Sequence, residues 1–195
     1  MANSRNDILR ALRAAHVPPK PLPDLPTSGV QYPDVHAQFA KSLSDVGGRC
    51  IFAGDGDIEI ALSKLPEYAS AIRVLSLVPG AKKANVNMAA IIDPTELADV
   101  DVCVLPGQLG VAENGAVWVV EDGFPFRAGW YLAQHMVLVL RADTIVHNMH
   151  EAYERISVGA RGFSTFISGP SKTADIEQSL VIGAQGPRSC TALVV

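Results

Sequence analysis

The densest group of polar, chemically capable side chains lies near the C-terminus, where an apolar run gives way to a Gly-Pro turn. The stretch reads Ser168-Gly-Pro-Ser-Lys-Thr-Ala-Asp-Ile-Glu177. We expect Ser171 and Thr173 to cap a helical turn and leave backbone N–H groups for an anion, while Lys172 adds positive charge. Asp175 and Glu177 are then available as acids, bases or hydrogen-bond anchors. The same residues also fit a turn that is closed by its own side chains, and composition alone does not separate the two interpretations.

A second polar turn, residues 107–115, lies between two predicted strands and reads Gly-Gln-Leu-Gly-Val-Ala-Glu-Asn-Gly. Gly110 and Gly115 let the backbone approach a ligand closely, and Glu113 with Asn114 adds a carboxylate and an amide. A dinucleotide-binding fingerprint requires a helix directly afterwards, whereas the following residues read as a strand. A phosphate-binding P-loop requires Gly-Lys-Ser/Thr after its glycines, and this chain has none there. Both nucleotide motifs are therefore rejected.

A third turn, residues 183–188, follows within a few residues of the first. Gln185 and Arg188 are its candidate ligand-binding residues. Arg188 either holds a carboxylate or phosphate through two hydrogen bonds or is a solvated loop charge.

Histidines and cysteines give no metal or nucleophile motif. His147 and His150 are three residues apart, but no HExxH pattern or third spaced ligand accompanies them, so we expect no metal site. His135 precedes a predicted strand and fits a structural imidazole or a cleft residue. The three cysteines are widely separated in apolar runs and are expected to be buried free thiols. No Gly-x-Ser-x-Gly elbow supports nucleophilic catalysis.

Aromatic side chains are concentrated in one loop that also contains proline and glycine. The cluster comprises Phe124, Phe126, Trp130 and Tyr131. Such a loop is either a lid or contact surface, or an anchor in the core.

Apolar periodicity predicts alternating helices and strands. Helices are expected at 4–15, 35–46 (ended by Gly47-Gly48), 58–65 (closed by Pro66) and 149–156 (capped by Asn148). Strands are expected at 50–53, 72–78, 100–105, 117–120, 136–140, 144–146, 163–167 and 191–195, with 81–98 ambiguous. The strands are nearly continuous apolar runs, so the sequence predicts an α/β fold with a largely parallel sheet covered on both faces. Residues 100–146 lack a long helix, and we expect some antiparallel pairing there.

Length and charge narrow the function classes. The chain has 195 residues, 48% of them hydrophobic, and a net charge of −4 at pH 7, which disfavours nucleic acid as a partner. No apolar run approaches the roughly 20 residues that a membrane span needs, and residues 1–13 lack the apolar core of a signal peptide, so we expect a cytoplasmic protein. Six prolines between Val17 and Pro33 predict a linker that straps the first helix onto the body. The domain division is therefore residues 1–33, helix and linker, and 34–195, one α/β domain.

The three polar segments resemble the LUD domain family, the family of lactate utilization protein C. The resemblance covers about residues 35–195 and rests on residues 110–115, on Ile145-Val-His-Asn-Met-His-Glu-Ala-Tyr153, on residues 168–178 and on Gly183-Ala-Gln-Gly-Pro187. The family often has histidine in the last of these turns, whereas this chain has Gln185. The resemblance implies a three-layer α/β/α fold similar to the ribose-5-phosphate isomerase and CoA-transferase group. It also implies a place in a multi-protein system that oxidises lactate to pyruvate, with iron–sulfur clusters on partner proteins and no cofactor on this chain.

The leading hypothesis is an accessory subunit of lactate utilization that works with iron–sulfur oxidoreductase subunits. Its pocket would join the 110–115 turn to the 169–177 segment and hold a small carboxylate or phosphate-bearing ligand, with Glu113 and Asp175 orienting the ligand or exchanging protons. One alternative is a free-standing enzyme of acyl or phosphosugar chemistry. Another is an interaction module whose aromatic loop, residues 124–131, docks on an iron–sulfur protein.

Overall fold

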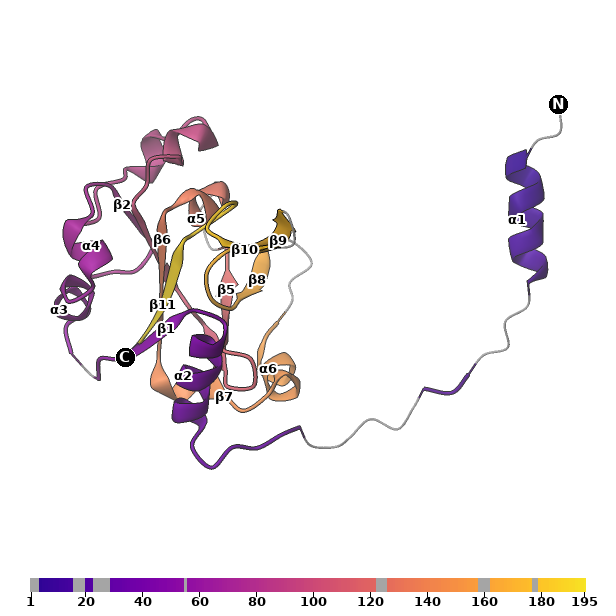
Figure 1. Ribbon diagram of the computed structural model, residues 1–195, viewed down its shortest axis with the longest axis horizontal. Helices are drawn as coiled ribbons and strands as arrows, with labels where there is room; N and C mark the ends of the chain where they lie inside the picture. The colour runs from indigo at the N-terminus through magenta and orange to yellow at the C-terminus, as the bar shows by residue number, and fades with distance from the viewer. Residues whose placement is uncertain are drawn as a thin grey trace.

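The computed structural model describes residues 4–15, 20–22, 29–54, 56–121, 126–157, 162–176 and 179–195. Its core is a five-stranded, entirely parallel sheet in the order β1-β11-β6-β3-β2 (Figure 1). The strands are β1 (Arg49–Phe52), β2 (Val74–Ser76), β3 (Val102–Pro106), β6 (His135–Leu140) and β11 (Ser189–Val194). The α/β class and the mostly parallel sheet expected from the apolar runs are confirmed.

Alternate residues of the central strands enter two different cores, which explains why the strands are apolar throughout. In β6, Met136 and Leu138 belong to one buried cluster, whereas Val137 and Val139 belong to another on the opposite face. A strand buried on both faces has no position for a polar side chain. The sheet is therefore the middle layer of the domain.

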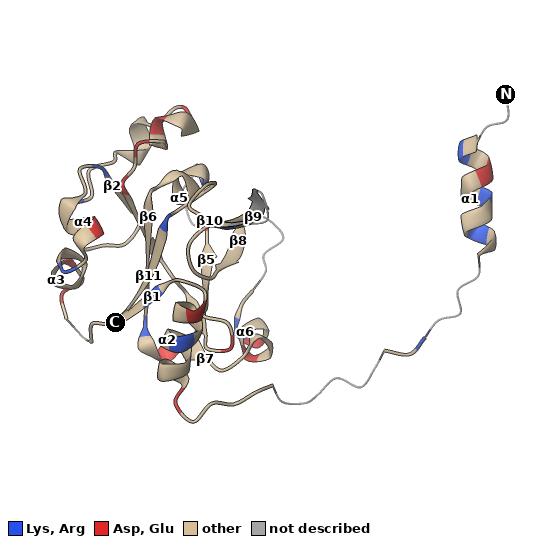
Figure 2. Cartoon of the chain, in the orientation of Figure 1, with Lys and Arg blue, Asp and Glu red and all other residues tan. Residues whose placement is uncertain are grey.

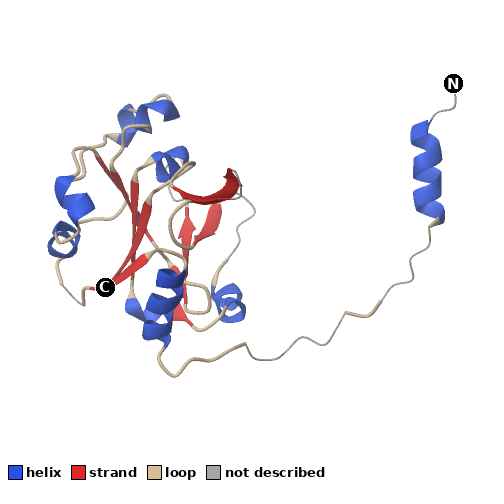
Figure 3. Ribbon diagram, in the orientation of Figure 1, coloured by secondary structure: helices blue, strands red, loops and turns tan. Residues whose placement is uncertain are grey.

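Helices α3 (Ile58–Ser63) and α4 (Pro66–Ser70) cover one face of this sheet (Figure 3). Asp57 caps α3 by accepting a hydrogen bond from the backbone N–H of Glu59 at 2.8 Å. As expected, α3 stops before Pro66, and Pro66 itself opens α4 at its first turn, where its missing N–H costs nothing.

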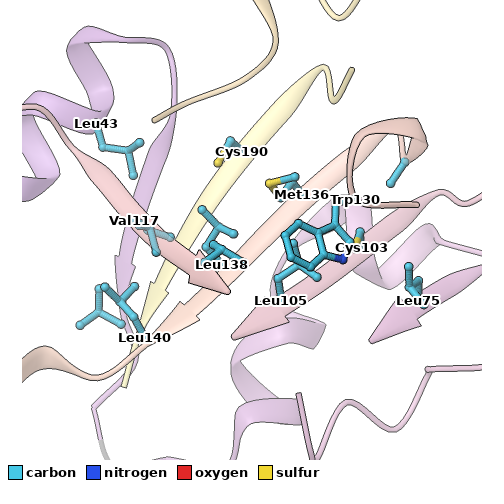
Figure 4. Packing of buried hydrophobic residues seen from close by; sticks show 14 of the residues in the cluster. Leu43, Leu75, Cys103, Leu105, Val117, Trp130, Met136, Leu138, Leu140 and Cys190 are labelled. Carbon is cyan, nitrogen blue, oxygen red and sulfur yellow. The ribbon is translucent and has the colours of Figure 1, made fainter. Parts of the chain in front are cut away.

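The other face is covered by α2 (Val35–Asp45), α5 (Ala128–Leu132) and a second sheet. This sheet has the order β7-β4-β5-β8, and its strands are β7 (Ile145–Val146), β4 (Leu109–Val111), β5 (Ala116–Val120) and β8 (Ser164–Ile167). The pairs β4·β5 and β5·β8 are antiparallel, as expected for the middle of the chain. Figure 4 shows the core between the layers, where Leu43 of α2 and Val117 of β5 lie close to Leu138 and Leu140 of the large sheet.

The remaining elements lie around these layers. Helix α6 (Met149–Arg155) packs through Ala152 on the outer face of the second sheet. Strands β9 (Lys172–Ile176) and β10 (Ser179–Ile182) form an antiparallel hairpin, and the ambiguous segment 81–98 contains two short 3₁₀ helices, Met88–Ala90 and Pro94–Leu97. Within the described ranges, no helix combines the length and the apolarity that crossing a bilayer requires.

The N-terminal segment is only partly docked on the domain. Helix α1 (Ser4–Ala14) forms as expected, but none of its residues is buried. Residues 29–33, by contrast, contact the start of α6: Val30 accepts a hydrogen bond from the Asn148 amide at 3.0 Å, and the Tyr32 N–H donates to His147 Nδ1 at 3.0 Å. The end of the linker is therefore strapped to the body, whereas α1 is not.

Candidate functional site

The segment with the most polar side chains forms a hairpin, not the start of a helix. Lys172–Ile176 is strand β9, and Thr173 pairs with Val181 of β10. The expectation that Ser171 and Thr173 cap a helical turn is therefore wrong. Thr173 lies opposite the β-branched Val181, and cross-strand pairing of such residues outweighs the capping preference of the hydroxyls.

Two of the three polar turns build one hollow of about 280 Å³, which we call the hairpin pocket. The hydrogen bonds Ser171 N–H to the Pro187 carbonyl and Gly183 N–H to the Ser171 carbonyl, both 2.9 Å, hold the turns together. The pocket brings together the predicted residues Ser171, Lys172 and Gln185. Its lining comprises Tyr131, Met136, Ile167, residues 169–172 and residues 185–187.

Lys172 gives the hairpin pocket its positive charge. Its ammonium donates a hydrogen bond to the backbone carbonyl of Val46, at the C-terminal end of α2. Within the part of the chain that the structure describes, no carboxylate forms an ion pair with Lys172. A carbonyl orients the ammonium without neutralising it, which leaves this positive charge uncompensated by any carboxylate among the described residues.

Tyr131 also lines the hairpin pocket. Burial raises the pKa of its phenol, against the opposing effect of the positive charge of Arg127. The hydroxyl therefore keeps its proton at neutral pH and can donate to an anion. The sequence marked Tyr131 only as part of an aromatic loop, and its place beside the Gly-Pro turn depends on contacts that no local pattern shows.

The other members of the aromatic loop have different positions. Trp130 is fully buried in the core, with its ring 6.0 Å from that of Phe163, and Phe126 packs against the same core. For these two residues the core-anchor interpretation is correct, and Trp130 presents no docking surface. Phe124 lies outside the described residues.

The 110–115 turn lies beside the hairpin pocket but contributes none of its lining residues. The Glu113 carboxylate accepts a hydrogen bond from the N–H of Met149 at 2.9 Å and so caps α6. The Asn114 side chain accepts from the Ala116 N–H at 3.0 Å and closes its own turn. These contacts hold α6 and the β4–β5 connection in place.

The two glycines of this turn are required by packing. A Cβ on Gly115, whose φ is +66°, would lie 2.5 Å from the backbone nitrogen of Leu43. A Cβ on Gly110 would lie 2.9 Å from Leu140 Cδ1. Close approach of the α2 backbone accounts for Gly115, and close approach of core side chains accounts for Gly110.

The remaining predicted site residues are described one by one. Thr173 is half-buried in β9, and Arg188 is exposed, with its N–H bonded to the Gln134 carbonyl at 2.8 Å. Asp175 lies in β9, but its side chain is outside what the structure describes, and Glu177 lies wholly outside the described residues.

A second hollow, of about 500 Å³, lies at the carboxyl ends of the parallel strands. It is lined by Gly56, Ile58, Arg141, Ala142, Asp143 and Val195. The chain leaves β1 towards the α3 face and leaves β6 towards the opposite face, so this hollow lies at a switch point of the topology, where α/β sheets commonly bind ligands. The sequence signal for this hollow is Gly54-Asp-Gly56, shortly after β1.

Charge distinguishes the two hollows. The Arg141 guanidinium in the second hollow donates to both Asp143 oxygens, at 2.9 and 2.6 Å, and this pairing holds the pKa of the Asp143 carboxyl below its usual range. The two charges cancel at the rim. An anion therefore gains less there than beside Lys172.

The histidines and cysteines described below make the contacts of structural residues. His147 accepts from the Tyr32 backbone, and His135 Nδ1 lies 2.8 Å from the Ser189 hydroxyl at the amino ends of β6 and β11. Burial raises the pKa of Cys50 to about 11 and that of Cys190 to about 12. Among the described residues, no group of three His, Cys, Asp or Glu side chains could hold a metal ion.

Comparison with known proteins identifies the relatives of this fold. The family described as the LUD domain matches residues 82–195. A lactate utilization protein C from Shouchella clausii is 32% identical over 109 residues, covering 53% of this chain and 47% of that protein. The protein of the same name from Geobacillus kaustophilus is 33% identical over 110 residues, covering 53% of this chain and 45% of that protein. The chain thus spans about half the length of these curated relatives.

Two Deinococcus radiodurans proteins match over most of the chain. A lactate utilization protein C from this organism is 25% identical over 203 residues and aligns with 100% of this chain and 93% of its own length. A crystal structure described as a DUF162 family protein from the same organism superposes with a TM-score of 0.62 at 20% identity, covering 83% of this chain and 96% of that one. This likeness supports the α/β fold described above.

Proposed function

The chain belongs to the LUD domain family, and on that premise we propose that it serves lactate utilization by binding a small anionic metabolite in the hairpin pocket. The ligand is a small carboxylate or a phosphate-bearing compound. One observation carries this proposal: Ser171, Lys172, Gln185 and Tyr131 surround a single hollow of about 280 Å³. A hollow of this size accommodates a metabolite of a few carbon atoms.

The lining has the composition of an anion site. The Lys172 ammonium supplies charge, while the Ser171 hydroxyl, the Tyr131 phenol and the Gln185 amide supply hydrogen-bond donors. Met136, Ile167 and the two prolines supply apolar contact for a carbon chain. Lactate, pyruvate and small phosphosugars all combine an anionic group with such a chain.

The protein acts as an accessory subunit, and partner proteins carry the iron–sulfur clusters of the oxidation. The names of the relatives, lactate utilization protein C, motivate the pathway, and the cysteines of this chain support the assignment of the clusters to partner proteins. Burial raises the pKa of Cys50, Cys103 and Cys190, and this disfavours the thiolate form that binds iron.

Calorimetric titration of the purified chain with pyruvate, lactate and a phosphosugar tests the proposal. We expect saturable binding of at least one of them, weakened about tenfold or more by Lys172→Met, because a charge-assisted contact contributes about 1.5–3 kcal/mol. Lys20→Met is the matched control, since it removes an exposed lysine outside the domain and should leave the affinity unchanged. Binding that survives Lys172→Met with full affinity would overturn this assignment of the site.

A further inference from the structure

Helix α1 leaves an apolar face uncovered. It has 11 residues, none of them buried, and the side chains of Ile8 and Leu12 are 59% and 65% exposed. Figure 1 shows the helix away from the folded body. Isolated helices shorter than about 12–15 residues are marginal in water, and most helical stability in proteins comes from packing an apolar face. Helix α1 therefore requires a surface to pack on.

The charges beside this face define the required surface. Arg5, Leu9 and Arg13 follow one another at intervals of one helical turn, in the row next to Ile8 and Leu12. The remaining arginine of the helix, Arg10, pairs with Asp7 at 3.5 Å away from this row. The face is thus apolar with a basic border, and its partner should be apolar with an acidic border.

A surface of that kind lies at the β2 edge of the domain, in residues 72–73 and 91–101, which we call the acidic corner. Ile72 and Ile92 are 86% and 88% exposed there. Three exposed carboxylates accompany them: Asp93, Glu96 and Asp99. Figure 2 shows acidic residues in this segment beyond β2 and basic residues along α1.

Hydrogen bonds tie the acidic corner together. The Asp101 carboxylate accepts from the N–H groups of Ile72 and Arg73 at 2.8 and 2.9 Å, and the Glu96 carboxylate accepts from the Ile92 N–H at 3.0 Å. Arg73 also bonds Asp99, which leaves the corner with more negative than positive groups. Backbone N–H donors hold the pKa values of Asp101 and Glu96 below their usual range, so both are charged at neutral pH.

The length of the linker disfavours docking of α1 on the acidic corner of its own chain. The contacts of Val30 and Tyr32 with α6 fix the linker at the opposite end of the body from the corner (Figure 1). Residues 15–29 span about 54 Å at most when fully extended, and about 47 Å in the polyproline conformation that their prolines favour. A domain of this size has a radius of about 20 Å, so half its circumference is about 60 Å. The corner of another molecule is not subject to this limit.

We propose that α1 of one molecule docks in the acidic corner of a second copy, so that two molecules exchange their N-terminal helices. Ile8 and Leu12 pack on Ile72 and Ile92 of the other copy. Arg5 and Arg13 face its carboxylates. Each copy offers both surfaces, so the exchange closes as a two-fold dimer and leaves neither helix uncovered.

Sedimentation equilibrium of the full chain tests this dimer. We expect a monomer–dimer equilibrium in which Leu12→Asp or Ile92→Asp weakens association at least about tenfold, because each buries a charge in an apolar contact. Both residues are largely exposed in the single chain, so folding should be unaffected. Arg13→Glu should also weaken the dimer, and combining it with Glu96→Arg should restore association. Arg10→Glu is the matched control, with the same charge change on the other side of α1 and no expected effect.

Three outcomes would overturn the proposal. The first is a wild-type chain that stays monomeric over a wide concentration range. The second is a dimer as tight with Leu12→Asp as without it. The third is a double variant, Arg13→Glu with Glu96→Arg, that associates no better than Arg13→Glu alone. The acidic corner and the hairpin pocket share no lining residue, so failure of the dimer would leave the ligand proposal intact.

Discussion

The Ser168 hydroxyl donates a hydrogen bond to the Asn114 carbonyl at 2.8 Å, joining two turns that are 54 residues apart in the chain. Both turns rest on the C-terminal end of α2, because Gly115 packs against Leu43 and Gly169 against Val46. The 110–115 turn therefore supports the position from which the hairpin pocket begins. The turn contributes no lining residue of that pocket.

Gly115→Ala should destabilise the domain by about 2–4 kcal/mol. The new Cβ would lie 2.5 Å from the Leu43 backbone, at a φ of +66° that alanine rarely adopts. Gly56→Ala is the matched control: its Cβ would meet only the Ala53 carbonyl at 3.6 Å, so stability should change by less than about 0.5 kcal/mol. Urea denaturation measures both. Equal stability of the two variants would contradict the packing described for Gly115.

Glu113→Gln should cost about 0.5–1 kcal/mol of stability and leave ligand affinity unchanged. The Glu113 carboxylate caps α6 through the Met149 N–H, and the amide that replaces it is a weaker acceptor without the charge that favours a helix start. Thermal unfolding and calorimetry on one preparation separate the two effects. If ligand binding disappeared while the unfolding temperature stayed the same, Glu113 would have to face the ligand after all.

Stability should depend on Asp101 only above acidic pH. Hydrogen bonds from the N–H groups of Arg73 and Ile72 hold its pKa below the ordinary value. A depressed folded-state pKa gives a contribution that is complete above the unfolded pKa, about 3.9, and is lost as the pH falls through the lower folded value. Asp101→Asn should therefore cost about 1–2 kcal/mol at neutral pH and progressively less below pH 3.9. A pH-independent difference between variant and wild type in urea denaturation would contradict this.

Sequence patterns correctly predicted the helices and strands that are set by residues close together in the chain. Helix α2 ends at Gly47, whose φ is +81°, and α6 begins after Asn148, whose side chain accepts from the Glu151 N–H. The strands of the large sheet follow from uninterrupted apolar runs such as Val102–Leu105, which are buried on both faces. These signals lie within a few residues of the structure they determine.

Long-range pairing accounts for what local patterns missed. The partition of the strands into two sheets depends on pairs such as Val117 with Ile167, whose separation no local signal encodes. At the start of β9, the hydroxyls of Ser171 and Thr173 predicted a helix cap. Pairing of β9 with β10 instead makes this segment a hairpin. No local pattern indicated that the Glu113 carboxylate accepts a hydrogen bond from the Met149 N–H, 36 residues further along the chain. The sequence indicated the turns containing Ser171 and Gln185, because each combines polar residues with glycine. No local pattern indicated that these two turns line the same pocket.

Chemical-shift mapping of the backbone amides during titration with pyruvate tests the central claim most directly. We expect saturable shifts at Gly169, Ser171, Lys172, Gln185 and Gly186, the residues of the two turns in the hairpin pocket that carry an N–H. Shifts concentrated instead at Gly56 and residues 141–143 would place the ligand in the hollow at the carboxyl ends of the sheet and contradict the account.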